Sequence, residues 1–353
     1  MGTTLSRNYN TLLTHAMDNI YQKGMFEDLI FKQNPTWAKM KDGGRVFTED
    51  GGAKLSVGLV YEENDTVDSY RGYEEFDVTP QDGHTNAFYD RAQYSGTVSI
   101  SGIEEHIAGG ANKIGDILND KVSQLVNSFG QRMNKDLLKV DVLADSEPGN
   151  GGRDLMAIGA YIQKTPSGAK TVGGIAQATE LGGTWQNQSV DGTGVTTSLG
   201  LTAKMRKLYN DCAKGGQGFP DLMLCDQTMF ENYEAHLDTK VRYTDADSSK
   251  ASSGFQGIKF KNAELYWDEM MGDPEAGVNY DNTPLESALY AINTKALKLS
   301  QAKGKDFAPT PFEWTAKQDA RVAAWLWYGQ LMAMNRRNLG LIYGVPYSLT
   351  IPA

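Results

Sequence analysis

Residues 101–142 read SGIEEHIAGGANKIGDILNDKVSQLVNSFGQRMNKDLLKVDV, and this stretch decides the fold. Ser101 and Glu104 match a capping box, in which two side chains satisfy each other's backbone N–H groups at the start of a helix. Apolar residues then recur at helical spacing: Ile107, Ile114, Leu118, Val122, Leu125, Phe129, Met133 and Leu137. They form one stripe, which predicts a helix roughly 57 Å long that is covered on one side.

The preceding segment, 45–100, has the alternation of strands. Apolar side chains alternate over 55–61 and again over 94–100, and the residues between them are polar, acidic and rich in turn formers. This pattern predicts a long two-stranded excursion whose ends return to one sheet. Because an isolated hairpin is marginal in water, a long one needs a surface to lie against.

The excursion carries the charge imbalance of the whole chain. The 353 residues have a net charge of −10, and residues 46–110 contain thirteen acidic and three basic groups. This balance argues against a protein that grips nucleic acid by its phosphates. Two interpretations stay open, a solvated acidic surface or an element that docks on a basic patch of another subunit.

The rest of the chain predicts an α+β protein. An amphipathic helix is expected over 5–23, and helix and strand patterns alternate after residue 198, with strands over 258–267, 288–299 and 322–334. The last of these is the longest apolar stretch and is too short to span a bilayer. A secretory signal pattern is absent at the N-terminus, and two cysteines exclude a disulfide-stapled fold.

Motifs for chemistry are missing. The four histidines form no metal-binding pair, and the sequence lacks nucleotide-binding and serine-nucleophile motifs. Cys225 and His236 could form a nucleophilic pair, but Cys225 is interpreted as an apolar strand residue. Trp325 and Trp327 are interpreted as core residues instead of base-stacking ones. We therefore predict a protein that is not an enzyme and has no cofactor or metal.

Several ordered motifs resemble the major capsid protein family of tailed phages, which has the Hong-Kong-97-type fold. The chain combines an N-terminal arm, a long acidic β-excursion and a long helix, followed by shorter motifs that resemble the family. These motifs are TVGGI at 171–175 with WQN at 185–187, FPDLML at 219–224, YWD at 266–268, LYAINT at 289–294, and a final strand from Gln330 to Gly344.

The resemblance implies a peripheral domain and an axial domain. The expected ranges are an N-terminal arm (1–44), an extended β-loop with peripheral-domain strands (45–100), a spine helix (101–145), an axial domain (146–254), peripheral-domain return strands (255–312), and the axial-domain final strand and C-terminus (313–353).

The function that the resemblance implies is a structural one. Copies of the chain would form the pentamers and hexamers of an icosahedral virion shell, assembled in the host bacterial cytoplasm, that holds double-stranded DNA non-specifically. Portal, scaffold and decoration proteins are possible partners, and no membrane is expected. An encapsulin-like compartment shell with protein cargo is an alternative, and a soluble hydrolase is a further one.

The candidate site residues are contacts between subunits. The acidic excursion, including Glu62, Glu63, Asp65, Asp68, Glu74 and Glu75, is expected to rest on basic groups of an adjacent subunit. The candidate basic groups are Arg132, Lys135 and Lys139 on the long helix, or Lys39, Lys41 and Arg45 near the arm. Some family members form an isopeptide cross-link from a loop lysine, and Lys54 is the one lysine between residues 45 and 112, although a plain surface charge is the favoured interpretation.

Overall fold

The computed structural model describes residues 36–37, 40, 46–62, 64–108, 111–138, 152–168, 170–177, 179–214, 218–238, 258–271, 288–316, 318–346 and 349–350. The helix expected over 5–23 and most of the expected N-terminal arm lie outside these residues. From the arm, Trp37 and Met40 are buried in the main core, and the Thr36 hydroxyl donates a hydrogen bond of 3.1 Å to Asp268.

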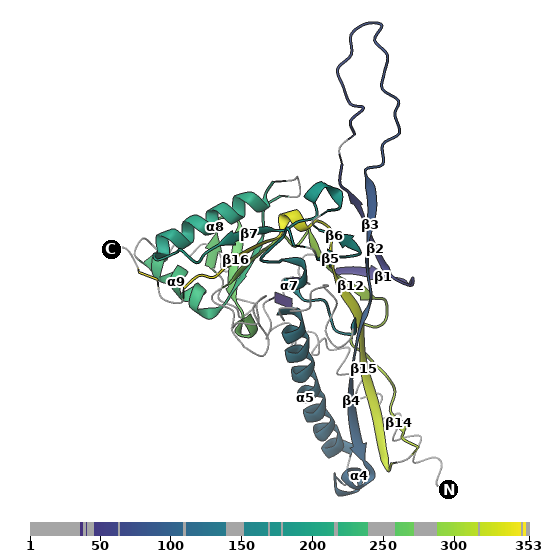
Figure 1. Cartoon of the computed structure of the whole chain (residues 1–353). Coiled ribbons are helices and arrows are strands. Elements are labelled where there is room, and N and C mark those ends of the chain that lie inside the picture. The colour runs from purple at the N-terminus through teal and green to yellow at the C-terminus, as the bar shows by residue number, and fades with distance from the viewer. Residues whose placement is uncertain are drawn as a thin grey trace.

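The protein has the predicted α+β class, with two six-stranded sheets that lie in different parts of the molecule (Figure 1). The first, here called the long sheet, has the strand order β1-β12-β15-β13, and β4 and β14 also pair with β15. Its strands are β1 (Val46–Glu49), β4 (Ala92–Ser101), β12 (Leu297–Ala302), β13 (Ala308–Pro309), β14 (Glu313–Trp314) and β15 (Ala320–Ala333).

The strand β15 is the central strand of the long sheet, because β4, β12, β13 and β14 all pair with it. It pairs antiparallel with β4 over ten residue pairs, from Ala92↔Gly329 to Ser101↔Ala320. Trp325 and Trp327 point into the core and are 2% and 0% exposed, which confirms their predicted role. The long helix covers this sheet, and Leu118, Val122 and Met133 of its predicted stripe are buried in the same core.

The predicted helix over 101–142 is two helices among the described residues. They are α4 (Gly102–Ala108) and α5 (Ala111–Leu138), and Gly109 and Gly110 between them lie outside the description. The 28 described residues of α5 correspond to about 42 Å, and residues 139–142 of the predicted helix also lie outside the description.

The predicted capping box at the start of α4 is confirmed. The Ser101 N–H donates to the Glu104 carboxylate at 3.0 Å, and the Glu104 N–H donates to the Ser101 hydroxyl at 3.3 Å. Lys121 of α5 reaches the same carboxylate at 2.8 Å and also donates to the carbonyl of Ser99 at 2.9 Å. The hydrogen bond from Lys121 is the main reason that the pKa of Glu104 is lowered. These contacts tie α4, α5 and the end of β4 together.

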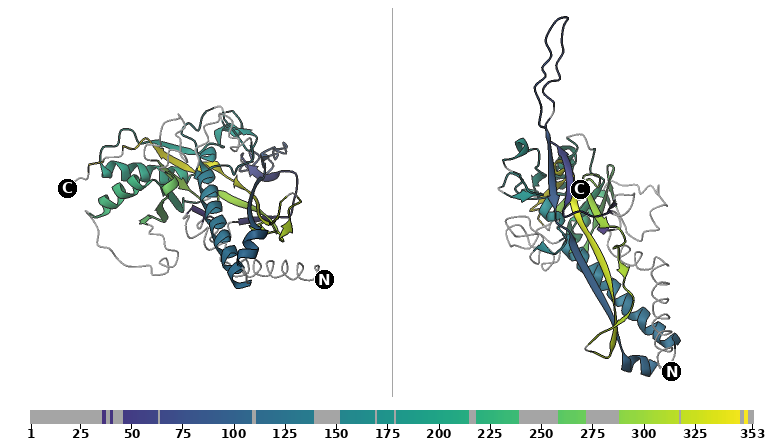
Figure 2. Two further views of the ribbon diagram at one scale, coloured as in Figure 1. Left: turned by 90° about the horizontal axis from the view of Figure 1, so that it is seen from below. Right: turned by 90° about the vertical axis from the view of Figure 1, so that its right-hand side faces the viewer.

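The second sheet, here called the compact sheet, has the order β7-β16-β11-β8-β10-β9. Helices α8 (Ser198–Cys212) and α9 (Gln227–Asp238) pack on it and share its hydrophobic core. Figure 2 shows this unit beside the long sheet and α5. Its strands are β7 (Gln188–Asp191), β8 (Leu222–Cys225), β9 (Ile258–Phe260), β10 (Ala263–Trp267), β11 (Leu289–Ile292) and β16 (Gly340–Tyr343). The short 3₁₀ helices are η1 (Leu181–Gly183), η3 (Glu269–Met271) and η4 (Arg336–Asn338).

The sheets divide the chain differently from the expected ranges. The strands β9, β10 and β11 fall in the range 255–312 that was expected to return to the peripheral domain, yet they belong to the compact sheet. The strand β15 falls in the range 313–353 that was expected to be axial, yet it pairs with β4. The single strand expected over 288–299 is β11 and β12, because a turn at Asn293 sends the chain from one sheet to the other; the Ala296 N–H donates to the Asn293 carbonyl at 2.9 Å.

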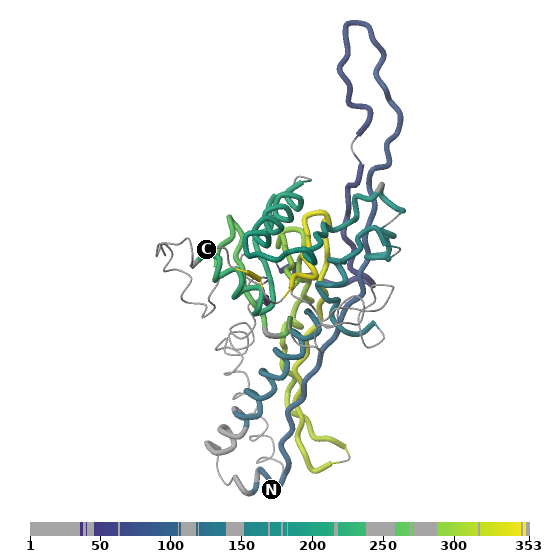
Figure 3. Tube along the Cα trace, turned by 60° about the vertical axis from the view of Figure 1, so that its left-hand side comes forward, coloured from purple at the N-terminus to yellow at the C-terminus, as the bar shows by residue number. Residues whose placement is uncertain are grey.

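The predicted excursion is the antiparallel pair β2 (Leu55–Val60) and β3 (His84–Tyr89), in register from Leu55↔Tyr89 to Val60↔His84. Its ends are continuous with β1 and β4, so both return to the long sheet as predicted. The excursion projects away from the body of the molecule (Figures 1 and 3).

The root of the excursion is covered by its own chain, which supplies part of the surface that a long hairpin needs. The inward face of the hairpin, Leu55, Val57, Leu59, Ala87 and Tyr89, is buried. The small hairpin of β5 (Thr171–Val172) and β6 (Ile175–Ala176) lies against it, near the single-turn helix α7 (Ile158–Tyr161).

A glycine allows the close approach of these two hairpins. The Phe88 N–H donates to the Gly173 carbonyl at 2.9 Å. Gly173 has a φ of 64°, and a Cβ there would lie 2.9 Å from the Ala87 side chain. A side chain at this position would therefore be strained by its backbone conformation and crowded against β3.

We expect Gly96→Ala to destabilise the fold by about 1–3 kcal/mol. Gly96 lies in β4 where α5 crosses it, and a Cβ there would lie 2.5 Å from side-chain atoms of both Leu125 and Phe129. The measurement is the free energy of unfolding in a denaturant titration. Gly58→Ala on β2 is the matched control, because its Cβ would meet no atom closer than 3.6 Å. Equal effects of the two changes would contradict the close packing of α5 on β4.

Candidate inter-subunit contact surface

The outer part of the excursion, residues 61–83, is here called the tip segment. At its root the Tyr61 N–H donates to the Gly83 carbonyl at 3.0 Å, and the Tyr61 hydroxyl donates to the Asp82 carbonyl at 2.7 Å. Beyond this point the described residues are almost all exposed, and the segment projects away from the body (Figures 1 and 3). The hairpin therefore has a covered root and an uncovered tip.

The root is fastened by Arg91. Its guanidinium makes a paired contact with the Glu49 carboxylate at 2.7 and 2.8 Å, and it donates to the Gly51 carbonyl at 3.1 Å and to the carbonyl of Gly52. The carboxylate is 5% exposed and the guanidinium side chain 18% exposed. Arg91 thus joins the end of β1 to the turn between β3 and β4, and it fixes the direction in which the excursion leaves the sheet.

The predicted acidic residues lie on the tip segment. Glu62, Asp65, Asp68, Glu74 and Glu75 are exposed, and Glu63 lies outside the described residues. Within the described part of the chain, none of these five carboxylates has a cationic side chain at ion-pair distance. Among the described residues, therefore, no cationic side chain neutralises these five carboxylates.

The tip segment also exposes apolar side chains, which the sequence analysis did not predict. Val67, Tyr70, Phe76 and Val78 are 64–87% exposed, and Tyr73 is fully exposed. The rings of Tyr70 and Phe76 contact each other edge to face with centroids 4.9 Å apart. Aromatic residues in a turn-rich acidic segment were the available sequence signal. Large exposed apolar groups on a projecting element are typical of a protein interface.

The predicted basic residues on α5 are engaged in their own subunit. Arg132 lies 2.8 Å from Asp136 and 3.1 Å from Asp154, whose carboxylates are nearly buried. The Tyr94 hydroxyl also donates to Asp136 at 2.7 Å. Burial raises the pKa of Asp136, and these hydrogen bonds oppose that shift. Lys135 is partly buried and is not free, and Lys139, like Lys39, Lys41 and Arg45, lies outside the described residues.

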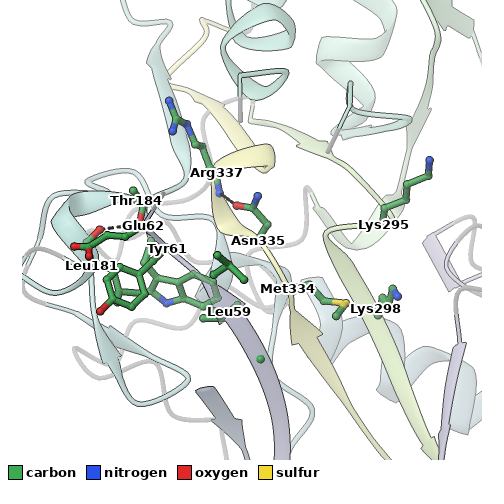
Figure 4. A pocket seen from close by; sticks show the side chains of 13 residues that line it. Leu59, Tyr61, Glu62, Leu181, Thr184, Lys295, Lys298, Met334, Asn335 and Arg337 are labelled. Carbon is green, nitrogen blue, oxygen red and sulfur yellow. Dashed lines mark hydrogen bonds between the residues drawn. The ribbon is translucent and has the colours of Figure 1, made fainter. Parts of the chain in front are cut away.

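Three other cationic residues line a cleft beside the root of the excursion, here called the basal cleft. Its volume is about 1040 Å³. Lys295 and Lys298 lie on one side, Tyr61, Glu62 and Leu181 lie on the other, and Asn335 and Arg337 lie between them (Figure 4). In the part of the chain that the structure describes, Lys295, Lys298 and Arg337 have no carboxylate at ion-pair distance. Sequence reasoning missed this group because the three residues come from different elements.

A buried arginine holds one wall of the basal cleft. Arg336 of η4 is completely buried and donates to the Tyr161 carbonyl at 2.9 Å, the Gln177 side chain at 2.9 Å and the Trp185 carbonyl at 3.1 Å. The Trp185 indole N–H donates to the Val172 carbonyl at 3.0 Å. The TVGGI and WQN motifs noted in the sequence are therefore parts of one hydrogen-bonded wall, and Arg336 fixes the position of its neighbour Arg337.

The remaining candidates do not assemble a catalytic centre. Cys225 is buried in β8 and its thiol donates to the Tyr266 carbonyl at 3.5 Å. Burial raises its pKa well above the ordinary value, which is the opposite of what an activated nucleophile needs. The described residues include no group of three or more His, Cys, Asp or Glu side chains placed to hold a metal ion, and no described helix could cross a membrane.

Lys54 lies at the root of the excursion instead of its tip. It forms an ion pair of 3.2 Å with Asp90, in which both side chains are more than half exposed. The predicted surface charge and the alternative cross-link both remain predictions, and the surface ion pair is the arrangement that the subunit displays.

Comparisons with solved structures identify the fold. No protein-family model matches the chain, and no curated protein matches it in sequence. Among solved structures, the capsid asymmetric unit of cyanophage A-1(L) matches with a TM-score of 0.59 and 14% identity, over 85% of this chain and 90% of that one. The holo-SrpI encapsulin complex of Synechococcus elongatus PCC 7942 matches with a TM-score of 0.53 and 10% identity, over 91% of both chains. The predicted resemblance to the tailed-phage major capsid protein fold is confirmed.

We expect Arg91→Ala to destabilise the fold by about 2 kcal/mol, because it leaves the nearly buried Glu49 carboxylate without its partner. Lys54→Ala is the matched control, since it removes the same charge from an exposed ion pair at the same root and should cost less than about 0.5 kcal/mol. Denaturant titration measures both. If the two variants lost the same stability, the ion pair of Arg91 with Glu49 would not be what holds the root of the excursion to β1.

We also expect both cysteines to resist alkylation in the folded protein, since Cys212 and Cys225 are buried and burial raises the pKa of each thiol. Mass spectrometry after iodoacetamide treatment should find neither modified without denaturant and both modified in urea. Rapid modification of either thiol in the native protein would contradict the packing of α8 and β8.

Proposed function

We propose that this chain is a shell subunit, the major capsid protein of a tailed phage, whose copies assemble into pentamers and hexamers of an icosahedral head. The observation that carries the proposal is the tip segment, which projects from the folded body and carries exposed aromatic rings and carboxylates that have no cationic partner among the described residues. A monomer gains nothing from such an element, whereas a neighbour in a shell can cover it. The fold supports the proposal because it is shared with a cyanophage capsid subunit.

The two units of the subunit suit this role. In the proposal, the long sheet with α4 and α5 corresponds to the peripheral domain, and the compact sheet with α8 and α9 corresponds to the axial domain that meets its copies around five-fold and six-fold centres. Contacts between unlike surfaces close into rings when the rotation between copies allows it. In the proposal, the excursion that projects from one side of each subunit supplies such a contact.

The proposed contents of the shell are double-stranded DNA held without sequence preference. The net charge of −10 suits a container that does not bind phosphates tightly. Portal, scaffold and decoration proteins are the further partners of this role, assembly in the bacterial cytoplasm is its setting, and the mature virion is its location.

A second candidate is an encapsulin-like compartment with protein cargo. The match to the SrpI encapsulin covers 91% of both chains and favours this alternative. Negative-stain microscopy of the expressed chain tests the shell function itself, and closed particles are expected. The contents of particles purified from infected cells separate the two candidates, because DNA identifies a phage head and an enclosed enzyme identifies a compartment. A chain that stays monomeric under all conditions would refute both.

We expect the rate of particle formation to fall as salt is raised, because the proposed contacts of the tip segment bring opposite charges together and salt screens them. Light scattering during assembly of the purified chain, at ionic strengths from about 0.05 to 0.5 M, measures the rate. A rate that does not change over this range would show that the carboxylates of the tip segment do not contribute to assembly.

A further inference from the structure

Four side chains meet where α5 packs against β4 and against the loop around residues 154–155. They are Tyr94, Arg132, Asp136 and Asp154, here called the aspartate cluster. We propose that the aspartate cluster is a proton-binding site in which Asp136 takes up a proton, so that acid strengthens the attachment of α5 to β4 and to this loop. The inference concerns the single subunit and does not depend on the proposed shell function.

One guanidinium serves two nearly buried carboxylates in the cluster. The Arg132 Nε atom lies 2.8 Å from Asp136, and its Nη2 atom lies 3.1 Å from Asp154. The side chains of Asp136 and Asp154 are only 3% and 9% exposed. Two ionised carboxylates and one guanidinium leave one excess negative charge where water has little access. Such a charge is unfavourable, and the binding of a proton removes it.

Asp136 is the carboxyl group that takes the proton. Its Oδ2 atom accepts both close hydrogen bonds, from the Arg132 guanidinium and from the Tyr94 hydroxyl. Its Oδ1 atom accepts none from the described residues, so one oxygen of a nearly buried carboxylate is left for a proton. Burial raises the pKa of Asp136 and the charge of Asp154 adds to this shift, while the two hydrogen bonds oppose it.

The charged groups that lie next to the cluster on the same or neighbouring elements are placed differently. Asp268, which directly precedes η3, accepts a hydrogen bond of 2.9 Å from Asn134 of α5. Lys135 is partly buried and has contacts of its own, and Arg153 is exposed. The groups that act on the charge of Asp136 among the described residues are the other three members of the cluster.

The cluster holds three segments together through Tyr94. The hydroxyl of Tyr94, on β4, donates to Asp136 of α5 at 2.7 Å and accepts from the Leu155 N–H at 2.8 Å. The next residue of the loop, Met156, donates its N–H to the Gln330 side chain of β15 at 2.8 Å. The protonation of Asp136 therefore acts on a joint between α5, the long sheet and the loop.

The direction of the pH effect follows from the raised pKa of Asp136. In the unfolded chain the carboxyl group has its ordinary pKa of 3.8, whereas the folded protein holds the proton to a higher pH. Between these two values the folded state binds more protons than the unfolded state. The stability that this group contributes is fully present below the ordinary value and is lost as the pH rises through the raised one. A carboxylate whose pKa is lowered by an ion pair has the opposite effect.

The variant Asp136→Asn tests the proposal in the full-length chain, because the amide keeps the size and the hydrogen-bond acceptor of the side chain without its charge. Denaturant titrations from about pH 4.5 to about pH 8 give the equilibrium constant for unfolding. The ratio of this constant, wild type to variant, should rise with pH by about threefold or more. Asp120→Asn is the matched control, since Asp120 is an exposed carboxylate on the same helix, and its ratio should stay constant.

The variant Arg132→Gln tests the cluster from its cationic side. Arg132 is about half exposed, so its replacement leaves the hydrophobic core intact. Both carboxylates then lack their cation, and the unfolding constant of the variant relative to wild type should rise with pH by about tenfold or more. A residue that served only in packing or hydrogen bonding would give the same loss of stability at every pH.

The outcomes are distinct. A ratio for Asp136→Asn that does not change with pH would show that Asp136 is a hydrogen-bond acceptor only, and a ratio that falls as the pH rises would show that the ion pair with Arg132 outweighs burial. Either result overturns the proposal. If Asp136→Asn does not fold, the pH dependence of Arg132→Gln decides. Because all of these measurements are made on single subunits, failure here leaves the shell function standing, and failure of particle formation leaves the aspartate cluster standing.

Discussion

The long antiparallel ladder between β4 and β15 is the constraint on which the rest of the structure depends. Its ten residue pairs align two distant parts of the chain, and β15 also holds β12, β13 and β14 in register. The helix α5 packs on this ladder where Gly96 gives it room. The excursion starts where the same ladder begins, so its direction is set by the sheet. The paired strands β4 and β15 thus connect the region covered by α5 to the root of the excursion.

A buried polar contact lies where the chain passes from β15 of the long sheet to β16 of the compact sheet. Burying an arginine is unfavourable unless its N–H groups find acceptors, and Arg336 finds them in the Tyr161 and Trp185 carbonyls and the Gln177 side chain. Gln330 has a similar role in the long sheet, where its amide accepts from the Met156 N–H at 2.8 Å and donates to the Asp90 carbonyl at 2.9 Å. Such bonds have directional geometry, so they specify how the loops around 156–187 lie against the ends of β3 and β15.

The excursion combines two different physical regimes. Its root buries alternate side chains against β5, β6 and α7 and is fastened by Arg91, so it behaves as part of the folded body. Its tip has exposed carboxylates and aromatic rings that no described part of the same subunit covers. The stability of the root lets the tip project in a constant direction, and the exposed chemistry of the tip makes a neighbouring surface favourable. The same hairpin thus has a root that is held by its own subunit and a tip segment that is left exposed.

The sequence by itself determined what depends on local periodicity. The capping box at Ser101, the apolar stripe of α5, the alternation of β2 and β4, and the acidic character of the excursion can all be predicted because each is a relation between near neighbours. Strand partners could not be predicted, since β11 and β12 read as one apolar run and only the turn at Asn293 assigns them to different sheets. The pairing of Arg132 and the gathering of Lys295, Lys298 and Arg337 were likewise decided by the tertiary structure. Whether a charge is neutralised depends on what lies within a few ångströms in space, and distant segments meet there in ways that spacing along the chain does not record.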